Sequence, residues 1–307
     1  MQYEVALQRV KGIKKSFDNA AQKSILKYKD NRIIDLYETS EVFEIFTSSE
    51  GASGSKKLSG SETPPLVSLQ DGYSVQIEEE RFGGGIELTE TEYAREAPDT
   101  SMKVNIALQR KRNALLVDNY NLFLTNMFLL LNDGFDGTYY QAPDTAAIFA
   151  THTWAAGGTF ANNSTDALDE DAVDAVVLHG GEFTDPQGVP MPIDFDTIIV
   201  KKGSPNAKFA KQQFAMGISP VSVADINIYY GEYTIIETPY ITTRANWFMR
   251  ASNFVQGNSL KVGIGVFPKL NDPIKQNNEA IRTNCTGFYK EGCVNMPMDW
   301  YGSTGAA

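Results

Sequence analysis

The chain has 307 residues, of which 42% are hydrophobic and 21% are charged, so its composition is that of a folded globular protein and excludes wholesale disorder. The formal net charge of −11 argues against a protein whose main task is to grip nucleic-acid phosphates, because such binding rests on clustered Lys and Arg. The first residues contain no apolar signal-peptide segment, so we expect the protein to work without crossing a membrane.

The first forty residues are helix-prone and basic, although the chain as a whole is acidic. The basic residues of this segment are Arg9, Lys11, Lys14, Lys15, Lys23, Lys27, Lys29 and Arg32. Two interpretations stay open: the segment presents a solvated helix face, or it is an arm that lies on an acidic neighbouring surface. Neither interpretation implies DNA binding.

The next segment contains two extended stretches on either side of a flexible tract. Residues 42–46 and 73–78 have strand patterns, and residues 47–65 are rich in Gly and Ser and include Lys56 and Lys57. A Gly/Ser-rich composition cannot build a core, and structureless loops of this length usually serve a partner or a ligand. We therefore predict a protruding hairpin with a mobile tip.

A further strand is predicted at residues 82–88, and it contains three consecutive glycines, Gly83, Gly84 and Gly85. Their spacing matches neither GxGxxG nor GxxxxGK[ST], and no helix opens directly on them, so a phosphate-binding loop is disfavoured. Glycine inside a strand is typical of a kink or bulge, which is the prediction here.

Residues 98–134 predict one long helix, which we place at residues 99–132. Pro98 and the following Asp, Thr and Ser punctuate its start, and Asn132-Asp133-Gly134 predicts a left-handed stop. At 1.5 Å per residue the helix is about 50 Å long, longer than a compact domain is wide. Its second half is apolar in nearly every direction, which predicts burial on all sides. Polar residues interrupt each stretch long enough to span a membrane, and they also disfavour a coiled coil.

The remaining chain alternates helices and strands. We predict a helix from residue 165 or 166 to residue 179, with Asp169, Glu170 and Asp171 at its start rather than in a calcium loop. A second helix runs from residues 204–205 to 216 and stops at Gly217. Strands are predicted at residues 197–200, 226–230, 233–237, 247–250 and 260–267, followed by further strands and a loose tail. The class is α+β with antiparallel sheets.

No catalytic signature accompanies the two histidines, His152 and His179, for which structural roles are predicted. Cys285 and Cys293 have no CxxC spacing and no nearby His, so metal binding is not expected. Unpaired thiols are favoured, and a disulfide across the short loop stays open. We predict that the protein is not an enzyme and that it has no catalytic, cofactor-binding or metal-binding residues.

Four local motifs, in this order along the chain, resemble the major capsid proteins of tailed bacteriophages, which have the Hong Kong 97 fold, and in particular the Mu-like head subunit. The motifs are Phe82-Gly83-Gly84-Gly85-Ile86-Glu87-Leu88-Thr89-Glu90, Ala150-Thr151-His152-Thr153-Trp154 with Asn162-Asn163, the approach to a strand at residues 188–200, and Thr242-Thr243-Arg244-Ala245-Asn246-Trp247-Phe248. The resemblance implies an N-arm at residues 1–41, an E-loop hairpin at 42–97, a P-domain with a long spine helix at 98–150, an A-domain at 151–259, and C-terminal strands at 260–307 that return to the P-domain.

The same resemblance implies a virion protein, assembled in the bacterial cytoplasm, that forms hexamers and pentamers of an icosahedral head enclosing double-stranded DNA without sequence-specific contacts. Implied partners are a portal, possible decoration proteins and a separate scaffold, with no removed propeptide. Some relatives join an E-loop lysine to a neighbour, but solvated Lys56 and Lys57 are favoured here. The basic arm is expected to lie against acids of a neighbour, including Glu78, Glu79 and Glu80. Asn119 and Asn126 are expected to be hydrogen-bonded at a seam. The alternatives are a bacterial nanocompartment shell of the same fold and a soluble α+β enzyme.

Overall fold

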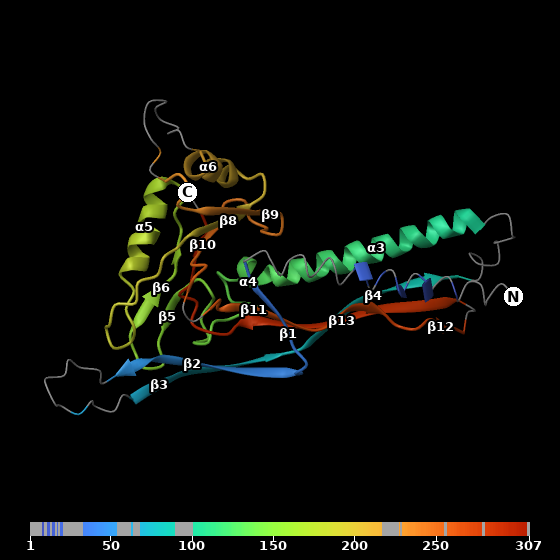
Figure 1. Cartoon of the computed structure of the whole chain (residues 1–307), viewed down its shortest axis with the longest axis horizontal. Coiled ribbons are helices and arrows are strands. Elements are labelled where there is room, and N and C mark those ends of the chain that lie inside the picture. Colours follow the sequence, from blue (N-terminus) through green and yellow to red (C-terminus); the bar gives the residue numbers. More distant parts are fainter. Residues whose placement is uncertain are drawn as a thin grey trace.

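The computed structural model describes most of the chain and shows an elongated molecule (Figure 1). The long helix and the strands beside it extend to one side, and two shorter helices gather with a second sheet at the other side. The described residues are 33–53, 63, 68–89, 101–216, 227, 229–254, 257–277 and 280–305, with residues 8, 11, 12, 14, 15, 17, 19 and 20. The predictions for Lys56, Lys57, Gly217 and the tip of the hairpin lie outside these residues.

The first sheet is built around the longest strand, β13. Its strands are β1 (Asp35–Glu38), β4 (Glu80–Leu88), β11 (Leu260–Leu270), β12 (Ile274–Lys275) and β13 (Ile281–Cys293). β13 pairs antiparallel with β4, β11 and β12, whereas β1 joins β11 in parallel. The helix-prone interpretation of residues 1–40 is wrong for β1, where pairing with β11 prevails over local propensity. Phe17 of the preceding segment is fully buried, and Lys14 pairs with Asp272 at 2.7 Å.

The glycine triplet lies in an unbroken antiparallel ladder from Glu80 opposite Tyr289 to Leu88 opposite Ile281, so the predicted kink or bulge is wrong. These positions need glycine because neighbouring atoms approach the strand too closely to leave room for a side chain. A Cβ atom at Gly83 would lie 2.1 Å from the carbonyl oxygen of Cys285, and one at Gly84 would lie 3.0 Å from Leu115 Cδ1. Glycine thus lets the long helix pack directly on the strand.

The long helix is confirmed but is divided into α3 (Ser101–Met127) and α4 (Leu129–Asn132), with a break at Phe128. It ends where predicted, but without the left-handed stop, since Gly134 has no positive φ and the first left-handed glycine is Gly137. Instead the Asp133 carboxylate accepts hydrogen bonds from the backbone N–H groups of Tyr139 and Tyr140, at 2.6 and 2.9 Å. The Asp133 side chain, and not a left-handed Gly134, therefore stabilises the turn that follows the helix.

The last turns of this helix form the centre of the main core. Phe123, Leu124, Phe128, Leu130 and Leu131 are at most 1% exposed and pack with strands of both large sheets. The burial on all sides predicted for the second half of the helix is wrong at its start, because Val117 and Leu122 are 53% and 40% exposed.

By length and composition alone, the stretch Arg110–Asn132 is long and apolar enough to cross a membrane, contrary to the sequence prediction. The core helix of a soluble protein passes the same test, and the buried half of this stretch packs on β4 and β13.

The two polar positions on the buried side of α3 behave differently. The Asn126 side chain donates to the Tyr289 hydroxyl on β13, which confirms the predicted seam contact. Asn119 is 3% exposed, but its amide donates to the Leu115 carbonyl of its own helix at 2.8 Å, and its side-chain oxygen has no partner among the described residues. Asn119 is therefore buried beside β4 as a seam residue would be, but it makes no hydrogen bond across the seam among the described residues, contrary to the prediction.

The second sheet has the order β7, β14, β10, β8, β9, and helices α5 and α6 accompany it. The elements are β7 (Asn163–Ser164), α5 (Glu170–Gly181), β8 (Thr197–Lys201), α6 (Pro205–Phe214), β9 (Thr234–Thr238), β10 (Trp247–Arg250) and β14 (Trp300–Ser303). β8–β9 and β7–β14 are parallel, so the predicted purely antiparallel sheets are wrong. β14 shows that residues 300–303 pair with β10 in this sheet, while Trp300 also belongs to the main core that contains the last turns of the long helix.

Local capping explains the helix bounds. α5 starts later than predicted because Asp169 is the N-cap, accepting from the Ala172 N–H at 2.8 Å. Ser204 caps α6 in the same way, with Pro205 in its first turn. Residues 229–230 form a turn, so the predicted strand 226–230 is wrong where it can be assessed.

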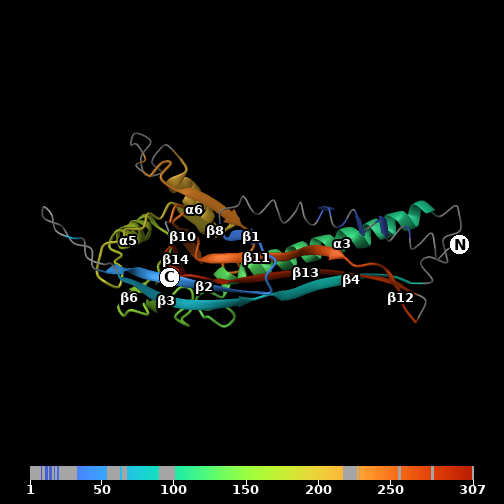
Figure 2. The ribbon, with the colours of Figure 1, turned by 60° about the horizontal axis from the view of Figure 1, so that its bottom comes forward.

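The predicted hairpin is confirmed and is longer than expected. It pairs β2 (Phe43–Ser53) with β3 (Ser68–Glu78) and runs past the small β5–β6 ribbon, Thr151–Thr153 and Thr159–Ala161 (Figures 1 and 2). The first part of the Gly/Ser-rich tract is strand, because ladder pairing uses backbone groups and does not need apolar side chains.

Candidate functional site

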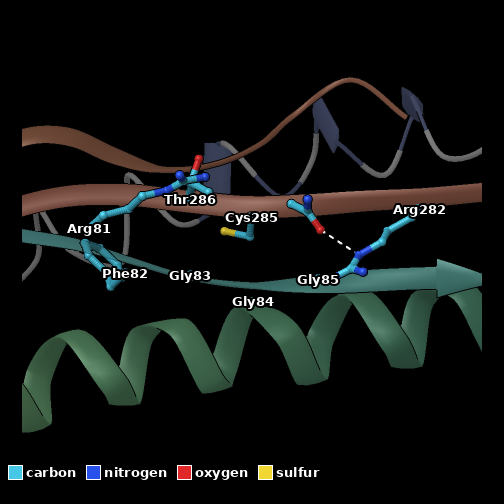
Figure 3. A pocket seen from close by; sticks show the side chains of 9 residues that line it. Arg81, Phe82, Gly83, Gly84, Gly85, Arg282, Cys285 and Thr286 are labelled. Carbon is cyan, nitrogen blue, oxygen red and sulfur yellow. Dashed lines mark hydrogen bonds between the residues drawn. The ribbon is translucent and has the colours of Figure 1, made fainter. Parts of the chain in front are cut away.

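A shallow groove lies between β4 and β13, close to the glycine triplet (Figure 3). Its volume is about 310 Å³, and its lining residues are Arg81, Phe82, Gly83, Gly84, Gly85, Arg282, Asn284, Cys285 and Thr286. Arg282 Nε donates to Asn284 Oδ1 at 2.9 Å, and the Arg81 guanidinium lies 5.9 Å from the centre of the Phe288 ring. Two guanidinium groups thus lie at the ends of a groove whose middle, on β4, is formed by the three glycines.

The chemistry available in this groove is binding rather than catalysis. Two guanidinium groups suit a carboxylate or phosphate. The lining contains no His, Asp or Glu that would act as a general base, and the Cys285 side chain is buried. The groove was not predicted from the sequence, since only the strand pairing brings Arg81 and Arg282 to its two ends.

Both histidines are held by structural contacts. His152 is fully buried, with Nδ1 3.1 Å from Asp144 Oδ1 and Nε2 3.0 Å from the Ile148 carbonyl oxygen. Burial would raise the pKa of Asp144, but hydrogen bonds from His152 and the Thr153 N–H lower it overall. His179 Nε2 lies 2.7 Å from the Ala161 carbonyl oxygen on β6. Neither ring faces a nucleophile.

The two cysteines are buried and form no disulfide with each other. They lie eight positions apart in the single strand β13, so at about 3.3 Å per residue their separation is several times that of disulfide-bonded residues. The short-loop disulfide is excluded, because the residues between them are strand. Among the described residues, no group of His, Cys, Asp and Glu side chains is arranged to hold a metal ion.

A buried carboxyl group lies at the junction of the hairpin with the first sheet. Glu291 on β13 is 8% exposed and accepts a hydrogen bond from the Tyr140 hydroxyl. Burial raises the pKa of Glu291 to about 8; the Tyr140 hydrogen bond opposes this shift and the nearby charge of Glu80 adds to it. The sequence offered one signal, a charged pair Lys290-Glu291 inside a strand.

We expect the stability of the subunit to fall as pH rises through the neutral range because of Glu291. Between its ordinary pKa of 4.5 and about 8, the unfolded chain loses the proton while the folded chain keeps it. Each unit of difference in pKa corresponds to about 1.4 kcal/mol. Urea unfolding between pH 5.5 and pH 8.5 should therefore show a shallower loss for Glu291→Gln than for the wild type. Parallel curves for the two proteins would contradict the assignment, and Glu87→Gln, at an exposed position, is the control.

The root of the hairpin is fixed by a buried charge. The Lys290 side chain is 1% exposed, and its Nζ lies 2.9 Å from Glu44 Oε1 and 2.8 Å from the Glu41 carbonyl oxygen. The Tyr37 and Thr39 hydroxyl groups also donate to Glu44. Burial would raise the pKa of Glu44, but these hydrogen bonds and the ammonium lower it. The ion pair joins β2 to β13, and the Tyr37 hydrogen bond connects β1 to the same carboxylate.

Several large apolar side chains are exposed on the single subunit and give candidate contact surfaces. They lie on the hairpin root, on the open face of α3 and on α5; the residues are Val42, Phe43, Ile45, Val117, Leu122, Val177 and Leu178. The most exposed of them are Val42 at 66% and Leu178 at 65%. Apolar residues at three separate places favour a subunit that contacts more than one neighbour.

Comparison with known proteins gives structural matches only. No family model matches the sequence, and no curated protein matches it. A solved capsid of an empty GTA particle is 11% identical with a TM-score of 0.56, over 90% of this chain and 89% of that chain. The capsid of Ralstonia phage GP4 is 10% identical with a TM-score of 0.54, over 86% and 84%. A structure from Mycobacterium phage Patience is 13% identical with a TM-score of 0.52, over 94% and 87%.

These likenesses cover nearly the whole chain in both directions, so they concern the arrangement of all its elements. The chain therefore has a phage-type capsid fold of mixed helix and strand. The resemblance seen in the sequence motifs is confirmed to that extent.

Proposed function

We propose that this chain is the structural major capsid protein of a tailed bacteriophage, which self-assembles as hexamers and pentamers into the icosahedral head around double-stranded DNA. The observation that supports it most is the capsid fold over about nine-tenths of the chain. Within this class the sequence motifs favour the Mu-like head subunit. The protein acts in the virion after assembly in the bacterial cytoplasm, together with a portal, a separate scaffold and possible decoration proteins, and without a membrane.

We propose the following roles for the segments of the chain. Residues 1–41 are the N-arm, 42–97 the E-loop, 98–150 the P-domain with the spine helix, and 151–259 the A-domain. Residues 260–299 return to the P-domain, while β14 completes the A-domain sheet. The exposed apolar side chains on the hairpin root, α3 and α5 are the proposed contacts between subunits. No residue is assigned a catalytic, cofactor-binding or metal-binding role.

Electron microscopy of the purified protein, alone and with co-expressed candidate scaffold genes, tests the proposal. We expect capsomers or closed shells, and we expect Leu178→Asp to reduce their yield because it places a charge in an apolar contact. Asp174→Asn, also on the exposed part of α5, is the control. A protein that stays monomeric at high concentration with and without scaffold would defeat the capsid function. Native particles that hold an enzyme in place of DNA would instead indicate a nanocompartment.

A further inference from the structure

The middle of the hairpin is held on the body of the subunit by a buried carboxylate. Glu50 on β2 is 2% exposed. Its Oε1 accepts a hydrogen bond from the backbone N–H of Ala155 at 2.9 Å, and its Oε2 accepts one from that of Ala156 at 2.8 Å. No Lys or Arg in the described part of the chain pairs with this carboxylate, so backbone N–H groups alone compensate its removal from water.

The turn that receives Glu50 is closed by hydrogen bonds of its own. The Trp154 N–H donates to the Gly158 carbonyl at 3.1 Å, and the Gly157 N–H donates back to the Trp154 carbonyl at 2.9 Å. Both glycines have positive φ, 92° at Gly157 and 90° at Gly158, which this tight turn requires. On the inner side, Asp144 Oδ2 accepts from the Thr153 N–H at 2.9 Å. Two consecutive N–H groups are thus presented together, as in other anion-binding concavities of the backbone.

The hairpin is shaped so that Glu50 reaches this turn. The pairing of β2 with β3 shifts register between Thr47 and Ser49 and again between Ser49 and Ala52, so Glu50 lies in an irregular part of the ladder. Such bulges re-aim side chains. Across the ladder, a Cβ atom at Gly72 would lie 2.9 Å from Glu50 Cγ and 2.3 Å from Ser48 Oγ. Glycine at this position leaves room for the stem of Glu50.

Two further contacts join the same stretch of hairpin to the body. Gln187 Nε2 donates to the Glu50 carbonyl oxygen at 3.2 Å, and Tyr73 on β3 packs against the core between α5, α6 and the second sheet. The other glutamate of β2 with buried partners, Glu44, holds the root of the hairpin through Lys290. The hairpin is therefore attached at two separate points along its length.

We propose that Glu50 and the turn at residues 154–158 form a latch, which fixes the direction of the β2–β3 hairpin relative to the body of the single subunit before any partner is present. The latch determines the direction in which strands β2 and β3 run along the body of the molecule. It goes beyond the capsid function and does not depend on it, because every contact that forms the latch lies within one chain.

Distance measurement by pulsed electron resonance on the unassembled full chain tests the latch. Spin labels are attached at Ser74→Cys on the hairpin and Leu178→Cys on α5, both at exposed positions; Cys285 and Cys293 are 1% exposed and stay unlabelled. We expect one narrow distance distribution for the otherwise native chain. Glu50→Gln should broaden it, because an amide offers one acceptor and a donor group to two N–H donors, leaving one buried N–H unpaired.

Hydrogen exchange gives the second measurement. In Glu50→Gln we expect exchange at Ala155 and Ala156 to rise by about tenfold or more, while peptides from β11 and β13 keep their protection, which shows that the fold is intact. Glu78→Gln is the matched control, since it makes the same change on an exposed position of the same hairpin. Glu50→Asp should give an intermediate result. An unchanged distance distribution together with unchanged exchange in Glu50→Gln would overturn the latch, whether or not shells form.

Discussion

Replacement of Lys290 by Met is expected to lower the free energy of unfolding by about 3–5 kcal/mol, the usual cost of removing one partner of a buried ion pair. Met fills the space of the Lys stem, so the loss comes from the charge. Glu44, whose side chain is 20% exposed, would keep only the hydroxyl groups of Tyr37 and Thr39 as donors, and the Glu41 carbonyl would lose its partner. Urea unfolding of the unassembled subunit measures the change.

Two companion variants separate the charge effect from other causes. Lys269→Met makes the same substitution on the neighbouring strand at an exposed position and should change stability by less than about 0.5 kcal/mol. The double variant Glu44→Gln with Lys290→Met should be more stable than Lys290→Met alone, because it no longer leaves a carboxylate without its cation. A loss below about 1 kcal/mol in Lys290→Met would mean that the ion pair does not hold the hairpin root.

Replacement of Gly83 by Ala is expected to cost about 3 kcal/mol, the upper end of the usual range for overpacking. The three atoms nearest the added methyl group are all backbone atoms, namely the carbonyl oxygen of Cys285 at 2.1 Å, its carbonyl carbon at 3.1 Å and Thr286 Cα at 3.2 Å. Backbone in the middle of a ladder cannot rotate away as a side chain can. The strands β4 and β13 must therefore separate locally, and thermal unfolding would record the loss.

Gly85→Ala provides the comparison at the same ladder. Its nearest atom is Asn284 Oδ1 at 2.9 Å, the end of a side chain that can turn aside. Removal of a glycine also lowers the entropy of the unfolded chain, which offsets part of the cost. We expect a net change below about 1 kcal/mol. Equal losses at Gly83 and Gly85 would show that the difference between backbone and side-chain obstruction does not matter here.

Local patterns predicted the elements whose cause is local. The long helix, the caps at Asp169 and Ser204, and the strands at residues 197–200 and 247–250 follow from periodicity and from side chains near in sequence. β1 and the long β2–β3 pairing were missed or shortened, because partner strands stabilise these polar segments and the segments lack strong propensity of their own.

The candidate sites depend still more on distant residues. Glu50 is 105 positions from Ala155, and Glu44 is 246 positions before Lys290, so no spacing in the sequence indicated either contact. The glycine triplet was recognised as unusual, but its reason, the approach of Leu115 and of the Cys285 carbonyl, appears only when α3 and β13 are in place.

The place of β14 affects how the subunit is made. This strand comes last in chain order, yet it lies between β7 and β10 in the second sheet, and its Trp300 is fully buried with its indole N–H donating to Asn258 at 2.9 Å. During synthesis the second sheet cannot close until residue 303 has left the ribosome, and contacts of such long sequence separation also form slowly. A nascent chain thus lacks the centre of its second sheet until β14 has emerged, although β7, β8, β9 and β10 are made earlier.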